Sequence, residues 1–138
     1  MPIEYRVNAP IDADQFIDLL HRSTLAARRP VNDRACMEGM VKNGNLCVTA
    51  WDGAKLVGIA RSVTDLHYAC YLSDLAVDTA YQRRGIGRTL IAHTQAQLGP
   101  QCKIRLLSAP AAADYYPGLG FVRNMNCWEL GRERRVDA

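Results

Sequence analysis

Apolar residues recur along this chain with two different periods, and the shorter period predicts its strands. Residues 3–7 alternate apolar and polar side chains, which is typical of a half-buried strand. The clearest hairpin joins Leu46–Trp51 to Lys55–Ala60 through Asp52-Gly53, a dipeptide that favours a tight turn. The apolar run Tyr71–Val77 then predicts a central strand. We therefore expect the hairpin and the central strand to form an antiparallel meander.

The longer period predicts helices. Asp12 can cap a first helix, and a second is expected over residues 33–42. The segment 23–32 between them has no regular period and is predicted to be a loop. A third helix begins at about Gly85 and is stopped by Gly99-Pro100.

Shorter elements are expected in the last third of the chain. Ile104–Ser108 predicts a short buried strand, and Ala111–Tyr116 a short helix that Pro117 ends. One or two final strands are expected over Gly120–Val122 and Cys127–Leu130.

This order of elements predicts an α/β (α+β) fold in one domain over residues 1–138. The length is sufficient for one hydrophobic core. We expect a mixed central sheet of six or seven strands with about four helices. Because a compact strand-helix-strand unit joins parallel strands, the fourth and fifth strands should be parallel.

Composition excludes several classes of function. The net charge of +3 is mild, and no dense basic patch with interleaved aromatic residues indicates nucleic-acid binding. The five cysteines are scattered without a C-x-x-C pair, so we expect neither a metal site nor a disulfide framework. No run is long and apolar enough to cross a membrane, and the cytoplasm is the simplest predicted location.

A glycine-containing turn between the central strand and the third helix predicts a phosphate site. Gly85 and Gly87 stand at the predicted helix start, where free N–H groups and the helix dipole favour an anion. A P-loop would need Lys after Gly87, and a dinucleotide fingerprint would need Gly at Leu90. Neither pattern is present. Three arginines add positive charge around this turn: Arg83, Arg84 and Arg88.

The pattern Gln82-x-x-Gly85-x-Gly87 resembles the acyl-CoA signature of the GCN5-related N-acetyltransferase (GNAT) superfamily. A second stretch, Ala112 to Phe121, is similar to the Ala-x-x-Phe-Tyr-x-x-x-Gly-Phe element of the same family. The resemblance covers the C-terminal half and implies a GNAT-like fold with splayed fourth and fifth strands. It also implies acetyl-CoA as the cofactor.

The resemblance implies how acetyl-CoA would be held. Its pyrophosphate would lie on the N–H groups of the turn and the helix start, and its pantetheine arm along the backbone of the central strand. The strand residues expected to contribute are Leu75, Ala76 and Val77. Those expected at the pyrophosphate are Gln82, Arg83, Arg84, Gly85, Ile86, Gly87, Arg88 and Thr89.

Two catalytic residues are predicted. Tyr116 stands where many family members keep the tyrosine that protonates the leaving sulfur. Asp74 lies in the central strand, where a carboxylate is costly to bury, and is the first candidate for the base. The chain departs from the family pattern at Ile104, where some members carry an acid, and at Ala109, where many carry asparagine.

The resemblance also bears on the acceptor. The loop between the first two helices forms one wall of the family's acceptor cleft, and Arg28 and Arg29 lie there as predicted substrate-binding residues. We expect transfer of an acetyl group to the primary amine of a small molecule. A protein amine as acceptor, or a non-catalytic acyl-CoA sensor, are the alternatives. Dimerisation through the last strands is common in the family, and the segment around Trp128 could serve a homodimer.

The predicted acid can be tested directly. Tyr116→Phe should lower turnover far more than affinity for acetyl-CoA, because the lost phenolic proton is needed only when the thiolate leaves. Thiol release measures turnover, and calorimetric titration measures affinity. Unchanged turnover would assign Tyr116 to packing alone.

Overall fold

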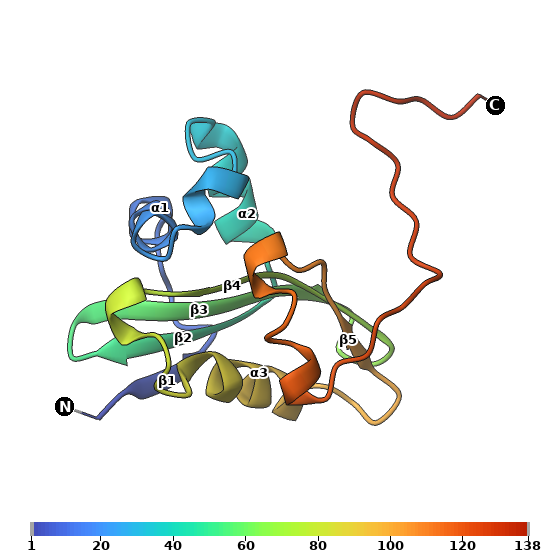
Figure 1. Ribbon diagram of the computed structural model, residues 1–138. Coiled ribbons are helices and arrows are strands. Elements are labelled where there is room, and N and C mark those ends of the chain that lie inside the picture. Colours follow the sequence, from blue (N-terminus) through green and yellow to red (C-terminus); the bar gives the residue numbers. More distant parts are fainter. Residues whose placement is uncertain (1, 138) are drawn as a thin grey trace. The chain divides into compact units, whose positions relative to one another are not determined.

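A computed structural model describes residues 2–137 of the chain. The chain divides into two compact units, Met1–Leu107 and Ser108–Ala138. The first unit contains one five-stranded sheet with the strand order β1-β2-β3-β4-β5 (Figure 1). Its strands are β1 (Glu4–Val7), β2 (Leu46–Asp52), β3 (Lys55–Thr64), β4 (Ala69–Val77) and β5 (Lys103–Arg105).

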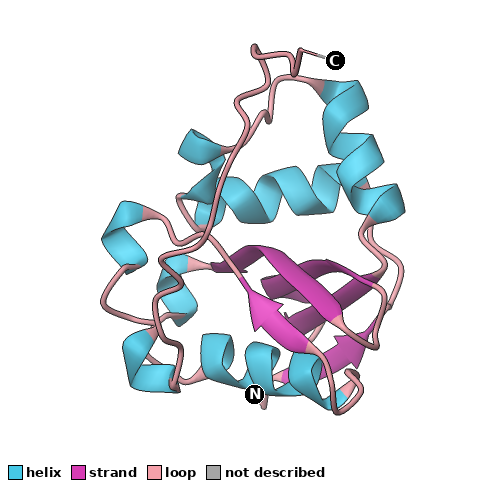
Figure 2. Cartoon of the chain, turned by 90° about the vertical axis from the view of Figure 1, so that its right-hand side faces the viewer, coloured by secondary structure: helices cyan, strands magenta, loops and turns pink. Residues whose placement is uncertain are grey.

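Helices cover both faces of this sheet, as Figures 1 and 2 show. α1 (Ala13–Arg22) and α2 (Arg34–Asn43) lie on one face, and α3 (Ile86–Ala96) packs against β2 and β3 on the other. The predicted cap of α1 forms a capping box, in which Asp12 accepts from the Gln15 N–H and the Gln15 side chain accepts from the Asp12 N–H. Asp33 likewise caps α2.

Each helical layer buries its own apolar surface. On the first face, Phe16 and Leu20 of α1 and Met37 of α2 are fully buried against Ile59 of the sheet. On the second face, Gly58 of β3 lets α3 approach closely. A Cβ at that position would lie 3.1 Å from the Leu90 Cδ1 atom and 3.2 Å from the Ile86 Cγ2 atom. The position of α3 on the sheet therefore depends on a residue without a side chain.

Strand directions agree with the sequence prediction. β1 to β4 are antiparallel neighbours, and β4 pairs with β5 in parallel. The parallel pairing covers only Ala69–Tyr71 and Lys103–Arg105, so β4 continues from Leu72 to Val77 without a β5 partner. We call the point where this pairing ends the β4–β5 fork.

A β-bulge lies next to this fork. Arg61 is paired with Asp74 and Ser62 with Leu72, which leaves Ser73 as one extra residue in β4. A bulge bends its strand and changes where the neighbouring side chains point. Nothing in the alternation of the sequence indicated it.

The α/β fold and the parallel pair are confirmed, whereas the number of strands is lower than expected. The sheet has five strands among the described residues, and Gly120–Val122 and Cys127–Leu130 are not strands. Alternation predicts a strand only where one face is covered, and the apolar side chains in this segment other than Phe121 are exposed. The most exposed are Val122, Met125 and Trp128.

Two further elements are shorter than expected. β5 ends at Arg105 rather than at Ser108. In place of one helix over Ala111–Tyr116, the second unit has short 3-10 turns at Pro110–Ala112 and Pro117–Leu119. Each turn begins at a proline, whose missing N–H is tolerated in a first turn but not within a helix. The assignment of the whole chain to one domain stays a prediction.

The remaining features of the described part are brief. The predicted loop 23–32 contains a 3-10 turn, η1 (Leu25–Arg28). None of the helices within residues 2–137 is long and apolar enough to cross a membrane. In the same part of the chain, no group of three His, Cys, Asp or Glu side chains is placed to hold a metal ion.

The close contact at Gly58 gives a stability prediction. Gly58→Val should lower the free energy of unfolding by about 1–3 kcal/mol, because the new side chain overlaps Leu90 and Ile86 of α3. Denaturant titration measures the change. Gly39→Val in α2 is the control, since a Cβ there meets no atom within 4 Å, and its effect should stay within about 0.5 kcal/mol. Equal effects at both positions would contradict the packing argument.

Candidate functional site

The turn between β4 and α3 has the backbone of an anion site. Gly85 is the N-cap residue of α3 and is left-handed, with φ +79°. Arg83 is left-handed as well, at φ 62°, which is uncommon for a residue with a side chain. A Cβ on Gly85 would meet nothing within 4 Å, so open space lies beside the backbone at this point.

Backbone donors at the start of α3 are available to a ligand. The first helical hydrogen bond runs from the Thr89 N–H to the Gly85 carbonyl oxygen, over 3.1 Å. The N–H groups of Ile86, Gly87 and Arg88 therefore precede the helical ladder and have no intrahelical acceptor. The helix dipole adds partial positive charge here, and the exposed side chains of Arg83, Arg84 and Arg88 add full charges. The arrangement can bind a phosphate group.

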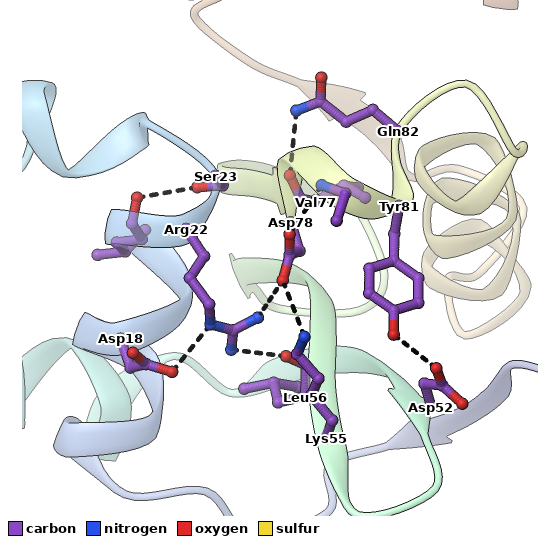
Figure 3. A network of polar contacts seen from close by, with 12 residues as sticks. Asp18, Arg22, Ser23, Asp52, Lys55, Leu56, Val77, Asp78, Tyr81 and Gln82 are labelled. Carbon is purple, nitrogen blue, oxygen red and sulfur yellow. Dashed lines mark hydrogen bonds and ion pairs between the residues drawn. The ribbon is translucent and has the colours of Figure 1, made fainter.

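The turn between β4 and α3, which we call the phosphate turn, is fixed to the sheet and to α1 through Asp78 (Figure 3). The buried Asp78 carboxylate accepts from Arg22 over 2.5 Å and from the Ala80 N–H over 2.9 Å, while its own N–H donates to the Val57 carbonyl oxygen. Arg22 also donates to the Leu56 carbonyl oxygen over 2.7 Å. Burial alone would raise the pKa of Asp78. The Ala80 N–H and the Arg22 and Lys55 charges outweigh that effect and lower the pKa.

Tyr81 attaches the same turn to the β2–β3 hairpin. Its hydroxyl donates to the Asp52 carboxylate over 2.5 Å, and this hydrogen bond raises the pKa of Tyr81. The Lys55 ammonium and the Arg84 guanidinium both lie near its ring, 5.3 Å and 5.1 Å from the centroid. Contact with the ring thus positions Arg84 beside the anion site.

The part of β4 that has no β5 partner, Leu72–Val77, lies next to this turn, and we call its outer side the open edge of β4. The Gln82 side chain donates to the Val77 carbonyl oxygen over 3.1 Å, which brings the turn back to the end of the strand (Figure 3). Ala76 is buried in the core, whereas Leu75 and Val77 are partly buried. The three strand residues predicted to contact the cofactor therefore lie beside the predicted pyrophosphate residues. That part of the predicted site is spatially continuous.

The structure brings Asp74, the predicted base, together with Arg29, a predicted substrate-binding residue. The fully buried Asp74 carboxylate accepts from the Arg29 Nε over 2.5 Å and from the Arg61 Nε over 2.6 Å. Arg29 comes from the loop between α1 and α2, and Arg61 from the neighbouring strand β3. Arg28, the other predicted substrate-binding residue, is exposed. The roles assigned to these residues stay predictions.

Tyr116, the predicted acid, belongs to the second unit. It is partly buried, and its ring makes edge contacts with Tyr115 and with Phe121, at centroid distances of 5.3 Å and 5.5 Å. The Phe121 N–H also donates to its carbonyl oxygen. Its catalytic role stays a prediction.

Sequence reasoning missed two groups of residues that shape this site. The first is Arg61, which interrupts the apolar run of β3. Because a buried arginine needs a carboxylate partner, this interruption is a signal that could have indicated its pairing with Asp74. The pair of Arg22 and Asp78 has no such signal, because the two residues are 56 positions apart in the sequence.

Comparison with known proteins agrees with the fold. A family model described as an acetyltransferase (GNAT) domain matches residues 22–128. GCN5-related N-acetyltransferase 2, a chloroplastic protein of Arabidopsis thaliana, is 33% identical over 72 residues. That match covers 49% of this chain and 27% of the relative, so the chain spans about a quarter of the relative's length.

Solved structures share the fold at low sequence identity. A GNAT-family acetyltransferase from Streptococcus pneumoniae has a TM-score of 0.73 and 20% identity, covering 96% of this chain and 100% of that one. An aminoglycoside acetyltransferase from an uncultured soil metagenomic sample, in complex with trehalose, has a TM-score of 0.69 and 22% identity. It covers 96% of this chain and 97% of that one.

The Asp78 network gives a prediction on stability and pH. Asp78→Asn should lower the free energy of unfolding by about 1–3 kcal/mol at neutral pH, because a charge-assisted hydrogen bond to Arg22 is lost. The pKa of folded Asp78 lies below the ordinary value of 3.8. The stabilisation is therefore complete above about pH 4 and is lost as the pH falls toward the lower folded pKa.

Denaturant titrations at several pH values measure this effect. The difference between wild type and variant should narrow on acidification. Asp18→Asn is the matched control, because it removes another carboxylate that accepts from Arg22, but an exposed one. Its effect should be smaller than about 1 kcal/mol. A larger loss from Asp18→Asn than from Asp78→Asn would contradict the assignment.

Proposed function

Because the chain belongs to the acetyltransferase (GNAT) family, we propose that it is an acetyl-CoA-dependent N-acetyltransferase acting on the primary amine of a small molecule. One observation carries the cofactor part of this proposal. The N–H groups at the start of α3 that have no intrahelical acceptor lie beside the edge of β4 that has no β5 partner. The hydrogen bond from Gln82 to Val77 brings these two features together. A ligand that has both a pyrophosphate and an extended amide chain fits that combination.

The residues present fit coenzyme A in two respects. The N–H groups of Ile86, Gly87 and Arg88, with the surrounding arginines, would bind the pyrophosphate. The backbone of Leu75 to Val77 would hydrogen-bond the two amides of the pantetheine arm, as an added strand does in peptide recognition.

A length argument indicates where the acyl end would lie. Ser73 is four residues before Val77, which corresponds to about 13 Å along the strand. The arm between pyrophosphate and sulfur is about as long as five extended residues, on the order of 17 Å. An arm that starts beside Gln82 and follows β4 would thus bring the thioester close to the β4–β5 fork.

When bound, acetyl-CoA supplies an activated acetyl group as a thioester. The chain's own residues must then orient the neutral acceptor amine and deliver a proton to the leaving sulfur as the C–N bond forms and the C–S bond breaks. The proton that the nitrogen loses goes to solvent or back to the phenolate of the proton donor. We assign the proton delivery to Tyr116, in agreement with the family resemblance. Both carboxylate oxygens of Asp74 accept from arginine side chains, so we assign no proton transfer to this residue.

The two alternatives make different predictions. A protein acetyltransferase would release thiol with amine-containing peptides and not with small amines. A non-catalytic acyl-CoA sensor would bind acetyl-CoA and release no thiol above the rate without protein. Thiol release measured across a panel of small primary amines and peptides distinguishes all three.

The cofactor assignment is tested by calorimetric titration with acetyl-CoA and with CoA. Gly87→Glu should lower the affinity for both by about 100-fold or more, because a carboxylate would stand at the pyrophosphate. The variant should remain folded, since glutamate favours a helix more than glycine does. Circular dichroism checks this.

Gly39→Glu in α2 is the matched control, with the same change of charge away from the turn and no atom within 4 Å of its Cβ. Its affinity for both ligands should equal that of wild type. Unchanged affinity in a folded Gly87→Glu variant would overturn the phosphate assignment. Failure of the folded wild-type protein to bind either ligand would overturn the proposed function.

A further inference from the structure

Four hydrogen bonds converge on the bulge beside the β4–β5 fork. Arg29 donates through Nε to Asp74 over 2.5 Å and through Nη2 to the Ser73 carbonyl oxygen over 2.9 Å. Arg61 donates through Nε to Asp74 over 2.6 Å and through Nη2 to the Ser73 hydroxyl oxygen over 3.0 Å. The bulge makes this possible, because two consecutive residues of β4 reach the same arginine.

The two arginines connect the bulge to different parts of the first unit. Arg61 is almost fully buried, and its Nη1 donates to the Met40 carbonyl oxygen of α2 over 3.2 Å. Arg29 follows η1 in the loop between α1 and α2, and its side chain keeps 21% of its surface exposed. The contact of Arg29 with Ser73 therefore connects that loop to the backbone at the fork.

Holding the Ser73 carbonyl has a defined geometric consequence. The peptide group that joins Ser73 and Asp74 is planar, so fixing its oxygen also fixes the direction of the Asp74 N–H. Backbone donors stabilise developing negative charge only when they are oriented before the reaction. Ser73 is the extra residue of the bulge and has no register partner in β3, whereas Asp74 is paired with Arg61, so the orientation of Ser73 is less constrained by the ladder.

We propose that Arg29, Arg61 and Asp74 act as positioning residues that hold the Ser73 backbone in the orientation required by the acetyl thioester at the fork. The inference rests on the proposed function, which brings the acyl end of the ligand to this point. Arg29 is the decisive member, because its Nη2 donates to the Ser73 carbonyl oxygen, whereas Arg61 donates to the Ser73 side chain. Asp74 fixes the Arg29 guanidinium and takes no proton.

Stability alone does not account for this arrangement. Replacing a buried ion pair by apolar side chains of similar size is often neutral or stabilising. The group also holds a backbone carbonyl that lies outside the regular pairing. If these residues position the backbone, changing them should alter the binding of acetyl-CoA more than that of CoA. A purely structural role predicts no such difference between the two ligands.

The test compares two ligands that differ only in the acetyl group. Arg29→Gln should weaken acetyl-CoA binding about tenfold. The Ser73 backbone would lose the charge-assisted hydrogen bond that orients it, and the loss of one such bond corresponds to about that change in affinity. Binding of CoA should change less than about threefold, because its pyrophosphate contacts at α3 are intact. Calorimetric titration measures both affinities.

A spectroscopic signature reports the same group. With acetyl-CoA labelled with ¹³C at the thioester carbonyl, the infrared carbonyl stretch of the wild-type complex should lie below its value in water. Arg29→Gln should move the stretch back toward that value. Arg29→Lys keeps the charge but lacks the planar fork whose Nε and Nη2 atoms bind Asp74 and the Ser73 carbonyl separately, so it should restore acetyl-CoA affinity only in part.

Arg34→Gln is the matched control. Arg34 also donates to a carboxylate over 2.5 Å, that of Asp14, but on the exposed surface at the start of α2. Its affinities for both ligands and its carbonyl stretch should equal those of wild type. A thermal unfolding scan of each variant accompanies the titrations, and Arg29→Lys carries the test if Arg29→Gln does not fold.

Asp74→Asn separates a positioning role from a proton transfer. If Asp74 acts through Arg29, the double variant Arg29→Gln/Asp74→Asn should show the same ratio of the two affinities as Arg29→Gln alone. Additive losses would overturn that assignment.

The inference and the proposed function fail in different ways. A folded Arg29 variant with the wild-type ratio of affinities and the wild-type carbonyl stretch would overturn the positioning role and leave the proposed function intact. A wild-type protein that binds neither ligand would overturn the proposed function itself.

Discussion

The buried carboxylate of Asp74 and the two guanidinium groups that donate to it connect β4, β3 and the loop between α1 and α2 within the first unit. A charge at a wholly buried position is tolerated only when it is paired and hydrogen-bonded. Arg61 meets it from the adjacent strand, and Arg29 meets it from a loop 45 residues earlier in the chain. Removing the Asp74 carboxylate would leave the almost fully buried guanidinium of Arg61 without a counter-charge, so three separate segments depend on this one side chain.

A second pair of opposite charges stands at the other end of the open edge of β4. Arg22 at the end of α1 holds Asp78, which follows the last residue of the strand, and Arg29 holds Asp74 at the bulge. The backbone between these points, Leu75 to Val77, is thus supported at both ends from the side of α1. Within residues 2–137, the outer edge of this segment has no strand partner.

Local patterns in the sequence accounted for the features that are themselves local. The cap at Asp12, the hairpin at Asp52 and the helix start at Gly85 each arise from a few neighbouring residues, and each is present. The pairing of Arg29 with Asp74 and the bulge at Ser73 depend on how distant segments pack, which no local period encodes. The expected final strands failed for a related reason, since alternation does not reveal whether a face is covered.

The conformation of the phosphate turn has a consequence for the kinetics of binding. Arg83 is already in the left-handed region, which costs a residue with a side chain about 1 kcal/mol or more, and the contacts of Asp78 and Tyr81 hold the turn there. Because the turn already has this conformation, binding of an anion requires little further ordering of its backbone. Association should then be limited by diffusion and by attraction to the arginines, and differences in affinity among acyl-CoA ligands should appear mainly in how slowly each one leaves.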